Sequence, residues 1–104
     1  RIEIMSKVKH IALIKFKEGT SPEQIDQVFD DLLELSESIP GIEDYVAGDD
    51  FTSEGLNHGF THGFIMTFQD RPARDAYMTH PEQERVKVVV GPFFESVLVF
   101  DFEV

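Results

Sequence analysis

The sequence of 104 residues contains no cysteine and no tryptophan, and basic residues are scarce. The absence of cysteine excludes disulfide bonds and metal sites built from thiolates. No apolar run approaches the ~20 residues that a membrane-spanning helix requires, and the N-terminal part lacks the charged-then-apolar plan of a signal peptide. These absences predict a soluble, cytoplasmic protein that has no membrane partner.

Positive charge is too scarce to favour a nucleic-acid partner. Nine Lys and Arg residues stand against 20 Asp and Glu residues, which gives a formal net charge of −11. A field of that sign repels a phosphate backbone at long range, so we expect no nucleic-acid binding. The sequence also contains no glycine-rich phosphate-binding motif and no nucleophile-elbow pattern. We therefore expect no cofactor.

Apolar and aromatic material is abundant. Hydrophobic residues make up 41% of the chain, and ten of them are Phe, a composition typical of a globular protein. The length suits a single domain with one two-layer core. We assign this domain to residues 7–104 and treat residues 1–6 as an N-terminal extension, native or added.

The first predicted strand, residues 8–17, is apolar on both sides. At a period of two, the alternation places residues on its two faces as follows: Val8, His10, Ala12, Ile14 and Phe16 on one, and Lys9, Ile11, Leu13, Lys15 and Lys17 on the other. Helices of the same chain can cover one face, and a second copy of the chain is the simplest cover for the other. His10 is expected to point into the layer that this partner covers, as a satisfied structural group or as the floor of a pocket.

A helix start follows the first strand. Ser21 is a good N-cap, Pro22 suits the first helical position, and Gln24 stands where a capping-box partner reaches back. The helix period then continues to Ser38. The remaining predicted elements are strands at 42–48, 61–68 and 94–102, a loop at 49–59, and helices from about 70 to 78 and from 81 to 90. The last helix is predicted against the strand propensity of its four valines.

The order of these elements is βαββαβ. It predicts an α+β, ferredoxin-like protomer with a four-stranded antiparallel sheet and helices on one face.

Several polar residues have an ordinary structural interpretation. His58 and His62 lie four residues apart, a spacing that shares a face on a helix but not across a loop-to-strand position, so we expect no metal site. His80 is expected to cap or orient the break before Pro81. The acidic pairs of the chain are expected to be solvated and not to form a catalytic dyad: Asp30 with Asp31, Asp49 with Asp50, and Asp101 with Glu103.

Short motifs spread over nearly the whole chain resemble one family. The motifs are Val8-Lys9-His10 with Phe16-Lys17, Gly59-Phe60-Thr61-His62, Tyr77 with His80-Pro81, and Val99-Phe100-Asp101. Their order and separation are similar to those of the stress-responsive α/β barrel (Dabb) family. The resemblance implies a ferredoxin-like protomer that forms a homodimer, in which two sheets close into a dimeric α/β barrel with the helices outside.

The resemblance also implies roles for individual residues. In the cyclase members of the family, a tyrosine and a histidine that face a cavity supply acid/base chemistry for an aldol ring closure. Tyr77 matches the tyrosine, and His80 matches the first histidine of a His-Pro-x-His motif. The second histidine of that motif carries the chemistry, and Gln83 replaces it here. Glutamine cannot exchange a proton near neutral pH, which disfavours the cyclase mechanism.

Three functional hypotheses remain open. The first is a non-catalytic or weakly catalytic protein that binds a small apolar or aromatic molecule in a homodimer cavity. The ligand-binding residues would be His10, His62, Phe64, Tyr77, His80 and Gln83. The second is an enzyme of cyclase, isomerase or cofactor-free oxygenase type, with His10 or His62 as base and Tyr77 as acid. The third is a structural oligomer without a ligand.

Overall fold

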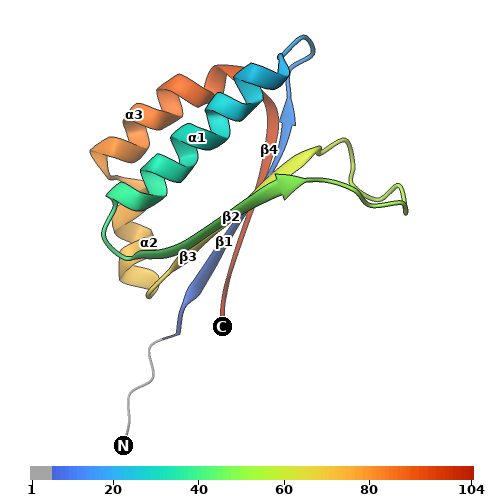
Figure 1. The fold of residues 1–104 in the computed structure, drawn as a ribbon. Coiled ribbons are helices and arrows are strands. Elements are labelled where there is room, and N and C mark those ends of the chain that lie inside the picture. Colours follow the sequence, from blue (N-terminus) through green and yellow to red (C-terminus); the bar gives the residue numbers. More distant parts are fainter. Residues whose placement is uncertain (1–5) are drawn as a thin grey trace, which may run out of the picture.

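The computed structural model describes residues 6–104 and confirms the predicted order of elements (Figure 1). The elements are β1 (Val8–Phe16), α1 (Pro22–Ser38), β2 (Ile42–Asp49), β3 (His62–Phe68), α2 (Arg71–Met78), α3 (Pro81–Val90), a 3₁₀ turn (Gly91–Phe93) and β4 (Phe94–Glu103). The predicted extension, residues 1–6, lies outside the described residues except for Ser6. The α+β, ferredoxin-like architecture predicted from the sequence is confirmed.

Side-chain caps start the helices where the sequence predicts them. Ser21 Oγ accepts a hydrogen bond from the Gln24 N–H at 3.1 Å, and Gln24 Oε1 accepts one from the Ser21 N–H at 2.9 Å. This reciprocal pair is the predicted capping box of α1. At α3, His80 Nδ1 accepts from the Glu82 N–H at 3.1 Å, so the predicted capping role of His80 is also confirmed.

The sheet has the strand order β2-β3-β1-β4, and all neighbouring strands are antiparallel. The central strand β1 places His10 opposite Met66 of β3 on one side and opposite Asp101 of β4 on the other. Met66 in turn lies opposite Tyr45 of β2. Residues that lie directly opposite each other on neighbouring strands project from the same face of the sheet. The side chains of His10, Met66, Asp101 and Tyr45 therefore lie on one face.

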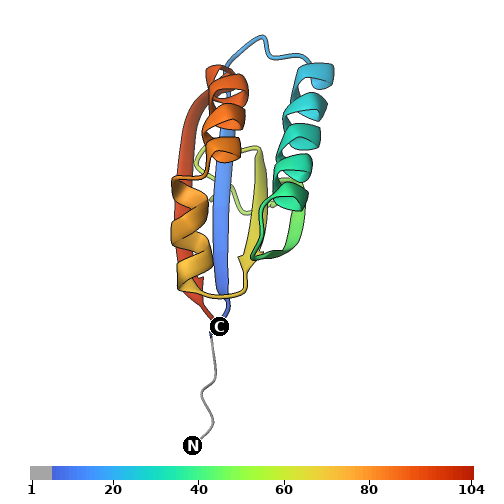
Figure 2. The same cartoon turned by 90° about the vertical axis from the view of Figure 1, so that its left-hand side faces the viewer.

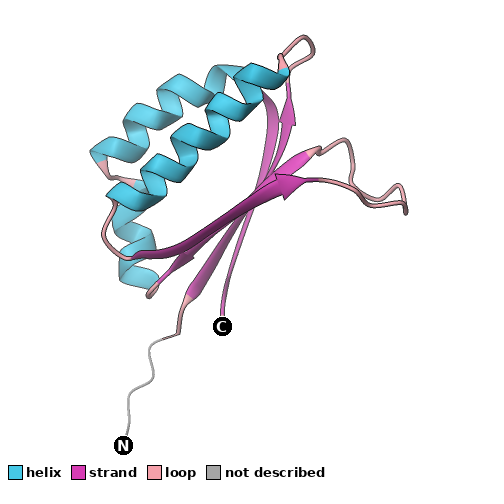
Figure 3. Ribbon diagram, in the orientation of Figure 1, coloured by secondary structure: helices cyan, strands magenta, loops and turns pink. Residues whose placement is uncertain are grey.

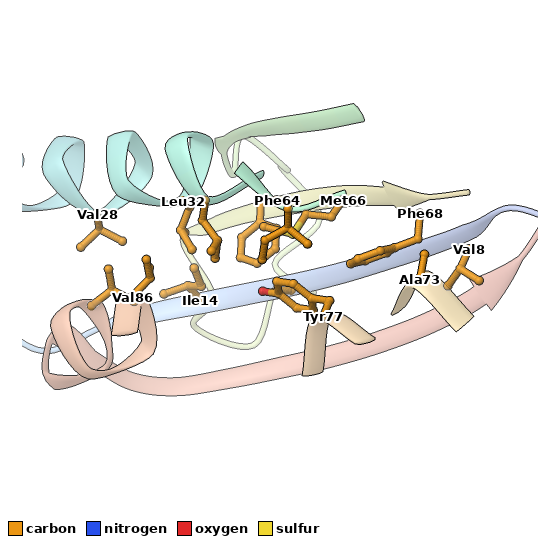
Figure 4. Packing of buried hydrophobic residues seen from close by; sticks show 14 residues of the cluster. Val8, Ile14, Val28, Leu32, Phe64, Met66, Phe68, Ala73, Tyr77 and Val86 are labelled. Carbon is orange, nitrogen blue, oxygen red and sulfur yellow. The ribbon is translucent and has the colours of Figure 1, made fainter. Parts of the chain in front are cut away.

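The three helices cover only one face of the sheet, as Figures 1 and 2 show and the colouring of Figure 3 makes plain. The core fills the layer between them, and Figure 4 shows its side chains pointing inward from the sheet and from the helices. Its largest fully buried members are Phe68, Ile14, Met66 and Val28. The strand propensity of the valines in α3 is overridden because Val86 and Val90 are buried in this core.

The opposite face of the sheet is apolar and open. On β4, Leu98, Phe100 and Phe102 are 45%, 59% and 43% exposed. The segment between β2 and β3 projects away from the helices in Figure 1. None of the helices within residues 6–104 is both long enough and apolar enough to cross a membrane. The predicted cytoplasmic location stays a prediction.

Candidate functional site

His10 faces the helices of its own chain, which corrects the expectation that it points toward a partner subunit. Its residue is only 6% exposed, and it shares the buried side of β1 with Val8, Ala12 and Ile14. Its ring centroid lies 5.8 Å from that of Tyr77, in an edge-to-face arrangement. The sequence pattern could not settle the direction because both faces of β1 are apolar.

A chain of charged groups holds the His10 ring. Asp101 Oδ1 lies 2.7 Å from His10 Nδ1, and Asp101 Oδ2 accepts a hydrogen bond from Arg74 Nη1 at 2.5 Å. Burial lowers the pKa of Arg74, but its hydrogen bonds to Asp75 and Asp101 prevail and leave this pKa raised, so the guanidinium stays charged. The prediction that Asp101 is a solvated acid was therefore wrong: its carboxylate joins two side chains. Glu103, the other acid of that predicted solvated pair, forms an ion pair with Arg71.

The contact with Asp101 fixes which nitrogen of His10 is free. An ionised carboxylate can only accept hydrogen bonds, so Nδ1 carries the hydrogen. In the neutral ring, Nε2 then holds the lone pair. Within residues 6–104 this nitrogen makes no hydrogen bond, and His10 lines a cavity. The arrangement is that of a general base whose second nitrogen is oriented by a carboxylate.

The cavity that His10 lines has a volume of about 580 Å³ and lies between the sheet and the helices of one protomer. Most of its wall is apolar. The residues that line it from β1 are His10, Ala12 and Ile14, from α1 Leu32 and Leu35, from β3 Phe64, from α2 Tyr77 and Met78, from α3 Gln83, Val86, Lys87 and Val90, from the following turn Gly91, and from β4 Phe94, Glu95, Ser96, Val97 and Val99. A cavity of this size suits a small molecule. Its place within one protomer differs from the expected place at a dimer seam.

Tyr77 brings a protonated hydroxyl to this cavity. The residue is 4% exposed, and Figure 4 shows its hydroxyl directed inward among the core side chains. Burial raises the pKa of Tyr77, and a hydrogen bond with the Gln83 side chain offsets part of this rise. Burial and the neighbouring Tyr77 likewise raise the pKa of Tyr45 to about 12. Both hydroxyls are therefore hydrogen-bond donors at neutral pH.

His62 lies at a different place from His10 and Tyr77. Its ring stacks on Phe29 with centroids 5.6 Å apart, meets Phe16 edge-on at 5.2 Å, and has Nδ1 2.8 Å from Thr61 Oγ1. It lines two surface hollows, one on each side of the end of β3, but it does not line the cavity with His10. The structure thus separates the two predicted bases.

The other predicted site residues divide in the same way. Phe64 and Gln83 line the cavity with His10, whereas His80 caps α3 and does not line it. The predicted absence of a metal site stays a prediction. Across residues 6–104, no cluster of three histidine or acidic side chains is suited to a metal ion.

Sequence reasoning missed two residues that support the site, Asp101 and Arg74, and a third, Tyr45, which neighbours Tyr77 without lining the cavity. Asp101 had a usable signal, because β1 and β4 are neighbours in a ferredoxin-like sheet and both residues of the His10–Asp101 pair fall on the same face. Arg74 and Tyr45 gave no comparable signal, since their positions depend on how α2 and β2 pack against the sheet.

Curated relatives cover nearly the whole chain. A stress-response A/B barrel domain-containing protein from Arabidopsis thaliana is 32% identical over 97% of this chain and 93% of its own length. Olivetolic acid cyclase from Cannabis sativa is 30% identical over 91% of this chain and 94% of the cyclase.

Solved structures share the fold. The hydroxynitrile lyase from Passiflora edulis superposes with a TM-score of 0.88 at 25% identity, covering 94% of this chain and 93% of the lyase. A dimeric ferredoxin-like protein of unknown function from Thermobifida fusca gives a TM-score of 0.82 at 22% identity, covering 96% and 92% of the two chains. The family model named stress responsive A/B barrel domain matches residues 8–104. Since that match spans almost the entire sequence, the chain belongs to the stress-responsive A/B barrel domain (Dabb) family.

Proposed function

We propose that the protein binds a small, largely apolar molecule in the cavity within each protomer and removes a proton from it, with His10 as the general base. The observation that carries this proposal is the buried His10–Asp101 contact of 2.7 Å, which leaves Nε2 as the lone-pair nitrogen of a ring that lines the cavity. An imidazole can take up a proton and return it under mild conditions, which is what a general base requires.

Each polar group has a defined part in the proposed reaction. His10 Nε2 takes the substrate proton, and the Asp101 carboxylate stabilises the imidazolium that results. The Tyr77 hydroxyl donates a hydrogen bond to the oxygen on which negative charge develops. When the proton comes from the carbon beside a carbonyl, the electron pair of the C–H bond moves onto that oxygen as an enolate. His10 returns the proton when the enolate is quenched.

The named activities of two relatives support this reaction class. Olivetolic acid cyclase and hydroxynitrile lyase are both named for reactions of small organic molecules. The cyclase is similar to this chain in sequence, and the lyase shares its fold. For a hydroxynitrile, His10 would take the hydroxyl proton while the carbon–cyanide bond breaks, so that a carbonyl forms and cyanide leaves with the electron pair. Proton removal by one base is the step that an enolate reaction and this cleavage share.

Hydrogen exchange tests the proposal without knowledge of the natural substrate. Phenylacetone in D₂O exchanges its acidic C–H hydrogens, and nuclear magnetic resonance follows the loss of their signal. We expect the wild-type protein to accelerate this exchange, or the cleavage of mandelonitrile to benzaldehyde, and His10→Ala to abolish the acceleration. His62→Ala is the matched control, because His62 does not line the cavity. Equal rates in wild type and His10→Ala, for both compounds, would rule out His10 as the base.

A non-catalytic binding protein is the second candidate. It is favoured by Gln83, which lines the cavity but cannot exchange a proton near neutral pH. In that case aromatic compounds would raise the melting temperature of wild type and His10→Ala alike, without any exchange. A panel of aromatic and polyketide-like compounds that produces no shift would count against both candidates.

We also infer that a second copy of the chain covers the open face of the sheet. The apolar side chains of β4 on that face are about half exposed, which is unusual for the outer surface of a monomer. Their partners across the ladder, Leu13 and Ile11, continue the same apolar face onto β1. The dimeric ferredoxin-like protein from Thermobifida fusca supports this inference through its fold.

A further inference from the structure

Lys9 is a half-buried cation on the open face of the sheet. Its ammonium donates a hydrogen bond to the Thr67 hydroxyl at 2.9 Å. Lys15, which lies on the same face of β1, forms an ion pair with Glu95 at 3.2 Å, whereas within residues 6–104 no ion pair joins Lys9 to a carboxylate. An ammonium has three donor hydrogens, so the hydroxyl engages only one of them.

Cover by a second copy of the chain makes the Lys9 charge costly. This inference rests on the proposed pairing, in which the open face of one copy lies against another. The water that solvates the ammonium in the free protomer is then excluded, and a buried cation is costly unless a carboxylate pairs with it. Asp44 of β2 lies on the same face, opposite Thr67, but it forms no ion pair with Lys9 in the protomer. The second copy is the other source of acids.

The segment between β2 and β3, residues 50–61, forms an ordered arm on the open side of the sheet. The Asp50 N–H donates to the Thr61 carbonyl oxygen at 2.8 Å, and the Thr61 N–H donates to the Ile14 carbonyl oxygen at 3.0 Å, which ties the base of the arm to β1. In Figure 1 the arm projects away from the helices, and in Figure 2 it lies behind the sheet while the helices face the viewer. The arm therefore stands on the side that a second copy would cover.

The arm presents apolar and acidic side chains. Phe51 is 97% exposed, and Leu56 lines a hollow of about 540 Å³ together with Leu13 of the open face, so the apolar surface of the arm continues onto the sheet. The arm contains the acids Asp50 and Glu54 and neither Lys nor Arg. The Asp50 carboxylate accepts a hydrogen bond from the backbone of the arm at 3.2 Å, whereas the Glu54 carboxylate accepts none within residues 6–104.

We propose that the arm is a clasp between two copies of the chain. The arm of each copy reaches over the sheet of the second, where the Glu54 carboxylate pairs with the Lys9 ammonium and Phe51 packs on the apolar open face. Two complementary observations carry this proposal: a cation that loses its water when the face is covered, and an acidic, apolar arm that stands beside that face. A two-fold axis repeats every contact, so the same ion pair forms twice.

The length of the sheet places the two members of this ion pair on different copies. Lys9 and Ile14, which anchors the arm, are roughly 17 Å apart along β1. A two-fold axis that crosses the strands brings the arm of one copy over the Lys9 end of the other. The chain from Asp49, at the end of β2, to Glu54 spans up to roughly 17 Å when extended, compared with ~10 Å between packed sheets. The arm is thus long enough to reach the second sheet.

Exchange of the two charges tests the clasp. Sedimentation gives the dissociation constant of the dimer, and we expect Lys9→Glu and Glu54→Lys each to raise it at least tenfold, because each places like charges in contact. The chain that carries both substitutions should recover to within about threefold of wild type. Since the two residues lie far apart within one copy, such a recovery arises between copies. Phe51→Ser should also weaken the dimer, whereas Val88→Ser on the helix side should not.

Cross-linking tests the place of the arm. The chain contains no cysteine, so Glu54→Cys and Asp44→Cys introduce single thiols, and a disulfide requires Cα atoms within about 7 Å. Oxidation of a mixture of these two variants should yield a covalent dimer. The same mixture with Val88→Cys in place of Asp44→Cys should not. Equal cross-linking of Glu54→Cys with itself would place the two arms side by side and overturn the proposal.

Three further results would also overturn it. The first is a wild-type dimer that the charge substitutions leave unaltered. The second is a tenfold weakening by Asp44→Asn but not by Glu54→Gln, which would show that Asp44 of the same chain neutralises Lys9. The third is a wild-type protein that stays a monomer, which removes the pairing itself. Only this last result counts against the proposed pairing as well, so failure of the clasp and failure of the pairing are distinguishable.

Discussion

At the scale of single residues, the site depends on one shared carboxylate. Asp101 uses one oxygen for His10 and the other for Arg74, so a single side chain orients the base and is itself neutralised by a cation. The His10 side chain is 7% exposed and that of Asp101 is 21% exposed, so water screens their contact only in part. A contact of this kind contributes both to the orientation of the ring and to folding.

Loss of the Asp101 charge should therefore destabilise the fold. We expect Asp101→Asn to lower the free energy of unfolding by about 1–3 kcal/mol, because His10 and Arg74 both lose a charged acceptor. It should also slow the proton exchange proposed for His10, since an amide can offer its N–H to Nδ1 and favour the other tautomer. Urea denaturation measures the first effect and nuclear magnetic resonance the second.

Asp75→Asn is the matched control for that prediction. Asp75 contacts the same arginine at 3.0 Å, but its side chain is 67% exposed. A surface ion pair of this kind contributes about 0–1 kcal/mol, so its loss should change the free energy of unfolding little and should not affect the exchange rate. Equal destabilisation by the two substitutions would contradict a special role for Asp101.

The buried tyrosine hydroxyls predict a loss of stability at alkaline pH. The pKa of Tyr45 rises from 10.0 in the unfolded chain to about 12 in the fold, mainly because of burial, and that of Tyr77 also rises. Between these values the unfolded chain releases tyrosine protons that the folded chain retains. The contribution of the protonated Tyr45 hydroxyl to the free energy of unfolding is therefore complete below pH 10. It falls as the pH rises toward 12.

Tyr45→Phe should flatten this decline, because one of the two tyrosines no longer titrates. Urea denaturation at a series of pH values on either side of the unfolded pKa measures the slope in wild type and in the variant. Lysines titrate in the same region, but they do so equally in both proteins. Identical slopes would show that the Tyr45 hydroxyl is not protected by the fold.

Residue-level prediction from the sequence succeeded where a motif fixes the local geometry. Ser21 and Gln24 form a capping box by virtue of their spacing alone, and His80 caps α3 because it precedes a proline at the helix start. The side to which His10 points could not be derived in this way, since its strand is apolar on both faces. Its direction is decided by which face the helices cover.

At the scale of elements, one glycine allows α2 to pack closely against the turn between α1 and β2. Gly41, between α1 and β2, has a φ of +92°, and a Cβ atom built on it would lie 2.7 Å from the Ala73 Cβ atom of α2. Gly41 therefore meets two separate constraints: a left-handed backbone that favours glycine and a close approach that excludes any side chain. The carbonyl oxygen of Gly41 also accepts a hydrogen bond from the Gln69 N–H, just before α2, at 2.9 Å.

Substitution of this glycine should separate the two constraints. We expect Gly41→Ala to lower the free energy of unfolding by about 2–4 kcal/mol, because both the backbone conformation and the contact with Ala73 become unfavourable. Gly19→Ala is the control, since Gly19 has a φ of +86° but open space around its Cβ position. It should cost only the backbone term of about 1–2 kcal/mol. Equal losses by urea denaturation would mean that α2 moves away freely.

Element boundaries were predictable to within about one residue, whereas contacts between elements were not. Turn and cap residues mark the ends of α1 and α3, and alternation marks the strands. Residues that depend on the packing of two elements, such as Arg74 of α2 and Tyr45 of β2, carry no sequence signal of their own. The predicted sheet order could have placed Asp101 beside His10, whereas the contact of Arg74 with Asp101 became visible only in three dimensions.

At the scale of the whole molecule, the sheet has two different faces. One face holds the cavity with His10 and is closed by helices of the same chain, while the other is apolar and open. The prediction from the sequence did not distinguish these faces, because it placed His10 on the face that the partner subunit covers. Because the cavity lies within one protomer, the proposed pairing and the proposed chemistry are separable.

The separation of the two faces means that the contact between copies can be disrupted without changing the cavity. Phe100 of β4 is 59% exposed and lies opposite Ile11 on the open face, so Phe100→Glu places a charge in the proposed contact between two copies. A buried, unpaired charge is costly, and we expect the variant to sediment as a monomer or to dimerise at least tenfold more weakly than wild type.

Val88→Glu is the control: Val88 of α3 is 74% exposed on the helix side, and its substitution should leave the dimer intact. Because the cavity wall comes from one chain, the Phe100→Glu monomer should retain the His10-dependent exchange as long as it stays folded. A wild-type protein that sediments as a folded monomer at micromolar concentration would show that the open face of the sheet meets water.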